Sequence, residues 1–174
     1  GGAFVAVAND ATAVRWNPAA IAALQRQEGA FAYADHFGLG LKDSYLSYVL
    51  PMTDNHALGL DWSYRGFDDV QAGLGLKNVQ NQFGFAYGYR NGIQRLRRWV
   101  GNAAIGVGGK YLSHSTDLDG ASAMSASGLG LDLGLLLPLP GNLRRGLVAQ
   151  DLGGTSFEHE SGLSEELYPG HYRL

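Results

Sequence analysis

The sequence predicts an all-β fold and, within that class, an antiparallel transmembrane β-barrel. Three observations lead to this prediction. The stretch from Gly128 to Leu137 carries leucine at every second position, with mostly glycine and one aspartate between. The same alternation recurs in several earlier segments, and the connections between the predicted strands alternate between short and long. Because side chains alternate across a strand, one face is bulky and apolar and the other small or charged, which suits a barrel wall in lipid.

The composition favours such a wall and limits the possible functions. Of the 174 residues, 17% are charged and 26 are glycine, whereas soluble domains have about 25% charged residues and about 7% glycine. The formal net charge of -3 gives no reason to expect a nucleic-acid partner. The chain has no cysteine, which excludes disulfides and thiolate metal sites. No apolar run reaches the roughly 18 residues of a membrane-spanning helix, so any crossing would use strands.

Residues 1–28 differ from the rest and predict a compact helical segment. Two alanine-rich, helix-prone stretches, 10–14 and 18–24, are separated at Asn17-Pro18. Asn17 can cap the second helix, and Pro18 suits the first turn of that helix. We therefore expect two short helices joined by a turn, too short together to form a domain.

The rest of the chain predicts seven strands and the beginning of an eighth. Their lengths agree with the roughly 9–11 tilted residues that cross a bilayer. Most of them place leucine, phenylalanine or tyrosine on one face and glycine, alanine or charged residues on the other. The predicted strands are 29–36, 44–50, 57–65, 82–90, 102–111, 128–137 and 144–151, and the eighth begins at 171–174.

The lengths of the connections predict which strand ends share a side. Residues 52–55 and 138–143 are short connections, 91–100 is intermediate, and 66–81, 112–127 and 152–170 are long. Transmembrane barrels have short periplasmic turns and longer extracellular loops. We therefore expect the N-terminal segment and the intermediate connection on the periplasmic side. Tyr64, Tyr89 and Tyr111 are expected near the outer interface, as part of an aromatic girdle.

Several motifs resemble a known family. Residues 2–13, followed by Trp16-Asn17-Pro18-Ala19, resemble the amino-terminal segment of FadL-type outer-membrane channels, and more closely that of the PorV-type barrels associated with type IX secretion. The similarity continues in residues 43–48, 128–137 and 150–154 and so covers most of the chain. It implies a barrel of about fourteen strands, inside which the N-terminal stretch folds as a hatch. Ala20 departs from the family, which usually has glycine there.

The resemblance divides the chain into a hatch or plug at 1–28 and a barrel wall at 29–174. Asn17, Pro18 and Ala19 are then the hatch motif. Because a barrel of about eight strands is filled by its own side chains, we expect the chain to be the N-terminal portion of a longer protein. Its beginning at Gly1-Gly2, without an initiator methionine, is typical of a fragment or of an exported protein without its leader.

A first group of charged residues shares the small-residue face and is expected to point into the lumen. These residues can tune passage or hold the hatch. The alternative, which we favour, is a structural ladder of paired charges, because a charge on the lipid face costs about 2–4 kcal/mol at mid-bilayer. The residues are Asp61, Arg65, Arg90, Lys110 and Asp132.

A second group, Arg95, Arg97 and Arg98 beside Trp99, forms a basic and aromatic cluster on the expected periplasmic side. Its possible roles are contact with phospholipid headgroups, contact with a partner, or simply a solvated turn.

No motif indicates catalysis. The five histidines lie at strand ends or in loops, and none has a partner at metal-ligand spacing. No Gly-x-Ser-x-Gly elbow occurs, and the glycine-rich runs lack the strand–turn–helix context of a phosphate loop. We therefore expect a protein that is not an enzyme, with no catalytic residue, no metal and no cofactor.

Two functions and a minor third remain. The first is a barrel in the outer membrane of a Gram-negative-type bacterium that passes or binds hydrophobic cargo such as fatty acids. The resemblance implies that displacement of the hatch would open the path for this cargo. The alternative role for the hatch segment is a static plug. The second is a barrel that binds partner proteins in a larger outer-membrane, secretion or cell-surface assembly and transports nothing itself. The third is a soluble β-sandwich used for adhesion.

Overall fold

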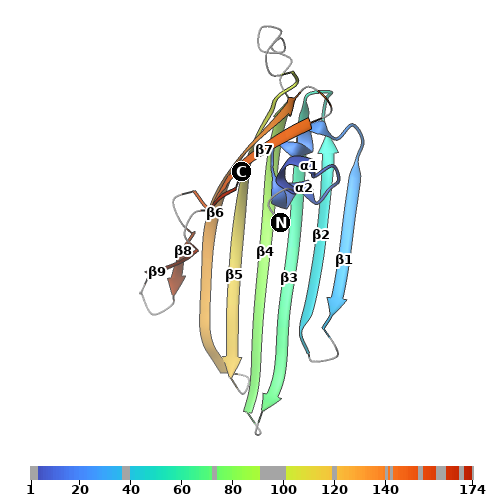
Figure 1. Cartoon of the computed structure of the whole chain (residues 1–174). Helices are drawn as coiled ribbons and strands as arrows, with labels where there is room; N and C mark the ends of the chain where they lie inside the picture. Colours follow the sequence, from blue (N-terminus) through green and yellow to red (C-terminus); the bar gives the residue numbers. More distant parts are fainter. Residues whose placement is uncertain are drawn as a thin grey trace.

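The chain is all-β, and its antiparallel strands form one sheet that curls into a half-barrel (Figure 1). The computed structural model describes residues 4–36, 40–71, 74–90, 101–118, 121–139, 141, 143–152, 155–159, 164–168 and 171–173. The helical elements are α1 (Phe4–Val7), α2 (Ala13–Trp16) and the 3-10 helix η1 (Ala20–Ala23). The strands are β1 (Glu28–Asp35), β2 (Lys42–Pro51), β3 (His56–Gln71), β4 (Leu74–Arg90), β5 (Ala104–Leu118), β6 (Ala121–Leu139), β7 (Leu143–Gln150), β8 (Thr155–His159), β9 (Ser164–Tyr168) and β10 (His171–Arg173).

The strands follow one another around the sheet in chain order. Each strand from β1 to β7 pairs antiparallel with the next, and β10 pairs with β7. The seven predicted strands and the eighth that begins at residue 171 are therefore confirmed. β8 pairs with residues 126–128 of β6, and β9 pairs with β8. Since the described strands belong to one sheet, the two stacked sheets of the β-sandwich alternative do not form among them.

The predicted long loops are wrong at three places. Residues 66–81 belong mostly to the hairpin of β3 and β4, and 112–127 belong mostly to that of β5 and β6. β8 and β9 lie within 152–170. The alternation of apolar residues fades in these stretches. Hydrogen bonding between the strand backbones does not depend on that alternation, so two antiparallel strands stay paired wherever both remain extended.

One tyrosine of the expected girdle lies at the opposite end of the sheet. Tyr64 and Tyr111 are seven residues short of the strand ends Gln71 and Leu118. Tyr89 instead pairs with His56, next to the short turn that joins β2 and β3. The three tyrosines therefore do not mark one side of the sheet. β3 and β4 run antiparallel, and Tyr89, the last residue but one of β4, pairs with His56, the first residue of β3.

The two faces of the curled sheet differ in side-chain size. The outer, convex face carries large apolar residues: Phe31 and Leu129 are each 72% exposed, and Leu60 is 58% exposed. The concave face carries alanine, glycine and a few charged residues, and α1, α2 and η1 pack inside it at one end (Figure 1). The alternation read in the sequence thus sorts large residues outward and small residues inward.

The hydrophobic core lies between the N-terminal segment, defined here as residues 4–27, and the concave face. Ile21 of η1 and Val14 of α2 are buried there with wall residues Ala57, Ala86 and Ala104. Small wall residues let the helical turns approach the sheet closely, so the segment is held by packing rather than by its own helical stability. Among the described residues, no helix combines the length and the apolar character needed to cross a membrane.

Candidate functional site

The site begins at Asn17, which is fully buried between the N-terminal segment and the wall. Its side-chain amide donates a hydrogen bond to the Val5 carbonyl at 2.9 Å and a longer one to the Leu135 carbonyl at 3.4 Å. Its side-chain oxygen accepts the backbone N–H of Ala19 at 3.0 Å. Asn17 therefore joins α1, the turn before η1 and strand β6. Asn17 was expected to cap the second helix, but η1 begins at Ala20 and its N-cap is Ala19. Asn17 instead stabilises the turn that leads into η1, by accepting the Ala19 N–H.

A row of glycines on three neighbouring strands forms the seat for this turn. Gly88, Gly106 and Gly134 are direct cross-strand partners on β4, β5 and β6. A Cβ on Gly134 would overlap the side-chain oxygen of Asn17, and one on Gly106 would overlap the Pro18 backbone. A Cβ on Gly88 would lie 2.7 Å from a side-chain carbon of Ile21. The absence of side chains in this row is what allows the Asn17-Pro18 turn to lie against the sheet.

Two further glycines extend the seat to either side. A Cβ on Gly59 of β3 would lie 2.6 Å from a methyl carbon of Val14. A Cβ on Gly146 of β7 would lie 2.6 Å from the Val5 carbonyl oxygen. Five consecutive strands, β3 to β7, thus each provide one glycine where the N-terminal segment packs. The role of these glycines is to leave room for the segment against the sheet.

Arg15 on α2 connects the segment to the charges of the wall. Its guanidinium lies 3.4 Å from the Asp61 carboxylate, donates a hydrogen bond to the Ser63 hydroxyl at 2.6 Å, and stacks over the Tyr45 ring at 5.2 Å. Sequence reasoning placed Asp61 in the lumen but missed Arg15. The signal was present: Asp61 was expected on the inner face, and a cation was available in the segment expected to fold against that face.

Lys110 and Asp132, both expected in the lumen, lie side by side on β5 and β6. The Lys110 ammonium is 3.0 Å from Asp132 and 2.9 Å from Asp151, which sequence reasoning did not select. Asp151 has a φ of 55°, a left-handed conformation that aspartate tolerates, and its backbone N–H donates to Asp132 at 2.9 Å. One ammonium therefore binds β5, β6 and the end of β7 together.

The other two expected lumen charges lie away from this cluster. Arg65 of β3 is on the concave face further along, where it pairs with Asp43 at 2.8 Å; Asp43 also contacts His36 at 2.9 Å. Arg90 lies at the rim and donates to the Asp54 carbonyl in the short turn at 2.7 Å. The basic cluster of Arg95, Arg97 and Arg98 lies outside the described residues.

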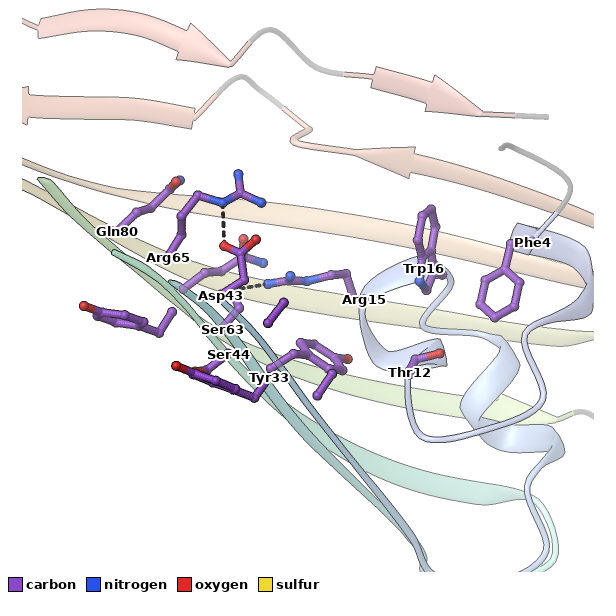
Figure 2. A pocket seen from close by; sticks show the side chains of 15 residues that line it. Phe4, Thr12, Arg15, Trp16, Tyr33, Asp43, Ser44, Ser63, Arg65 and Gln80 are labelled. Atoms are coloured by element: carbon purple, nitrogen blue, oxygen red, sulfur yellow. Dashed lines mark hydrogen bonds and ion pairs between the residues drawn. The ribbon is translucent and has the colours of Figure 1, made fainter. Parts of the chain in front are cut away.

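A cavity of about 710 Å³ lies between α2 and the inner surface of β1 to β4 (Figure 2). Phe4, Trp16 and Arg15 border it on the side of the N-terminal segment, and Arg65 and Gln80 border it from the strands. A smaller cavity of about 270 Å³ shares Arg15 with the larger one and is also lined by Asp61, Lys110 and Asp132. Within the described part of the chain, no three histidine or acidic side chains gather as a metal site.

The fold and the site define a class: a curled antiparallel half-barrel with an N-terminal segment seated on a glycine row of its concave face. Compared with models of protein families, with curated proteins and with solved structures, the chain has no match.

Proposed function

We propose that the chain forms the wall of an outer-membrane β-barrel of the FadL/PorV type, which passes or binds hydrophobic cargo without catalysing a reaction. In this proposal residues 29–174 are barrel wall and residues 1–28 are the hatch. The concave face with its cavity is the lumen, and the convex face contacts membrane lipid.

The observation that carries the proposal is the convex face. Leucine, phenylalanine, valine and tyrosine from six adjacent strands stand exposed there, including Leu131 and Leu133 on β6 and Phe83 and Phe85 on β4. An apolar surface of this extent is a liability in water, because contiguous exposed patches on soluble monomers are usually a few hundred Å². It suits the outward-facing apolar band of a transmembrane barrel.

The concave face supports the cargo part of the proposal. The cavity next to the N-terminal segment has a volume of about 710 Å³, within the roughly 300–1,000 Å³ of small-molecule sites. Arg15 and Trp16 of α2 line both this cavity and the smaller one, so movement of α2 would join the two spaces. A hatch in this position controls the passage along the lumen.

A cross-link tests the transport role directly, because the chain has no cysteine of its own. The double variant Val14→Cys with Gly59→Cys places two thiols where the segment touches β3. In proteoliposomes, uptake of a fluorescent long-chain fatty acid should stop on oxidation and return on reduction, while Val14→Cys alone should be unaffected by oxidant. Uptake that continues through the oxidised form would show that the hatch is not the gate.

A second function, a barrel that holds partner proteins, is favoured by the lengths of the central strands. β3 to β6 contain 16, 17, 15 and 19 residues, whereas about 9–11 tilted residues cross a bilayer. Their hairpins would therefore extend several residues beyond the membrane as a regular β surface. If proteoliposomes show no uptake in any state and a partner co-purifies only while the β3–β4 hairpin is intact, this second function holds.

A further inference from the structure

The cations that line the larger cavity are already paired with carboxylates. Arg15 and Arg65 are its cations, and each already faces a carboxylate, Asp61 for Arg15 and Asp43 for Arg65. In the neighbouring cavity Lys110 faces two carboxylates, Asp132 and Asp151. At the two cavities three cations thus face four carboxylates, so no excess positive charge is left there for an anionic ligand.

An anion in the cavity would compete for an arginine that already faces a carboxylate, and at Arg15 it would draw the guanidinium away from Asp61. Asp61, which is almost fully buried, would then lose its cation inside the wall. Removing one partner from a buried charge pair is costly because the other charge remains desolvated. The same pairing leaves no unbalanced carboxylate in the larger cavity for a cationic ligand. The charges of the site therefore favour a neutral molecule.

Neutral hydrogen-bonding groups remain uncommitted on the wall of the cavity. Gln80 and Gln82 stand at alternate positions of β4 and face the same side, and their side-chain amides have no hydrogen-bond partner among the described residues. Each amide offers two donors and one acceptor. They can therefore bind hydroxyl or carbonyl groups of a ligand without giving up an existing contact.

The opposite side of the cavity is aromatic. Phe4 and Trp16 pack edge to face with ring centroids 5.4 Å apart, and both line the cavity from the N-terminal segment (Figure 2). A flat apolar part of a ligand can lie against these rings while its polar part reaches β4. The cavity thus presents an aromatic side and an amide side around paired charges.

We propose that this cavity binds a neutral molecule that combines a flat apolar part with several hydroxyl groups, such as an aryl glycoside, and that it discriminates against anions of the same shape. The proposal rests on the proposed function, because the cavity lies in the lumen of the proposed barrel, and it narrows the cargo from hydrophobic molecules in general to neutral hydroxylated ones.

A pair of probes that differ in one group tests the discrimination. The full chain, reconstituted in lipid nanodiscs, is titrated with 4-nitrophenyl β-D-glucoside and with 4-nitrophenyl β-D-glucuronide, which carries a carboxylate in place of a hydroxymethyl group. Calorimetry should show the glucoside binding at least about tenfold more tightly than the glucuronide. Equal or tighter binding of the glucuronide, or no binding of either probe, overturns the proposal.

Substitutions in β4 test the location. Gln80→Leu and Gln82→Leu should each weaken glucoside binding by about fivefold, the effect of one lost neutral hydrogen bond. Gln25→Leu, at an exposed position outside the cavity, is the matched control and should leave binding unchanged. Unchanged binding in both β4 variants would place the ligand elsewhere and contradict the proposal.

A third substitution keeps the test decisive if the leucine variants fold poorly. Gln80→Lys adds a cation to the larger cavity alone and should reverse the preference, so that the glucuronide binds more tightly than the glucoside. If the preference does not change, charge balance does not set the selectivity. Heat-modifiable migration of the same preparations on gels distinguishes failure of this inference from failure of the proposed function. A folded barrel that binds no glucoside refutes this inference alone. A chain that stays folded and monodisperse without lipid or detergent refutes the proposed function.

Discussion

Asn17 shows how one side chain can determine the position of a whole segment. Its amide satisfies the carbonyl of Val5 and the N–H of Ala19, and both lie where water does not reach. Buried backbone groups without partners are costly. The role of Asn17 in a turn is predictable from the Asn-Pro sequence. Its contact with Leu135, 118 positions away, is not, because that contact depends on the register of six strands.

The variant Asn17→Ala should lower the free energy of unfolding by about 1–3 kcal/mol, because it leaves buried polar backbone groups unpaired. The measurement is the midpoint of thermal unfolding in detergent micelles, followed by circular dichroism. Asn102→Ala, at an exposed position, is the control and should match the parent. Equal midpoints for the two variants would show that the Asn17 contacts do not hold the segment.

The glycine row gives a second prediction at this scale. In Gly134→Val the new side chain would overlap Asn17, and overpacking of this kind typically costs about 1–3 kcal/mol. We expect the N-terminal segment to leave its seat, so that trypsin cleaves after Arg15 and Arg26 more rapidly. Gly109→Val is the control, since a Cβ there meets no atom within 4 Å. Equal cleavage in both variants would contradict the seat.

At the scale of elements, the strands were predictable and their ends were not. Alternation located β1 to β7 because the concave face excludes large residues wherever the N-terminal segment packs, as at Gly59 and Gly106. Beyond that level the concave face carries larger polar residues, as in the Asn78, His114 and Thr116 contacts between β4 and β5, and the contrast in size between the two faces is lost. The sequence then looks like a loop, although cross-strand pairing continues to Gln71 and Leu118.

The Lys110 cluster holds the last strands of the sheet to its centre. Lys110→Met should lower the free energy of unfolding by about 3–5 kcal/mol, because Asp132 and Asp151 would remain as mostly buried carboxylates without their cation. Lys77→Met, at an exposed position on β4, is the control and should change stability little. Chemical unfolding in micelles measures the difference. A Lys110→Met variant as stable as the control would mean that the cluster does not join β5, β6 and β7.

The cluster also shows where sequence reasoning stops. Lys110 and Asp132 could be placed on one face from their strand positions, but Asp151 follows β7 and reaches Lys110 only through its left-handed backbone. A conformation of one residue outside a regular element cannot be read from periodicity. Arg15 was missed for a related reason, since the packing of α2 decides which wall charge it meets.

At the scale of the whole molecule, the proposal assigns opposite environments to the two faces. A charge on the convex face should therefore be costly near the middle of the strands and tolerated near the hairpins. Leu131→Arg should lower the free energy of unfolding in lipid vesicles by about 2–4 kcal/mol, whereas Leu139→Arg, on the same face at the last residue of β6, should cost about 0–1 kcal/mol. Both leucines are exposed, so a soluble protein would tolerate the two substitutions equally.

The most direct test of the two faces uses spin labels, because the chain contains no cysteine that would compete for them. Single variants Leu60→Cys and Leu131→Cys place a label on the convex face, and Ser63→Cys places one on the concave face beside Arg15. After reconstitution in liposomes, power saturation compares collisions with oxygen, which concentrates in lipid, and with a nickel chelate, which stays in water. The account predicts that the two convex labels collide with oxygen and not with the nickel chelate. The concave label should not show this preference for oxygen. Convex labels that are reached freely by nickel would contradict the central claim.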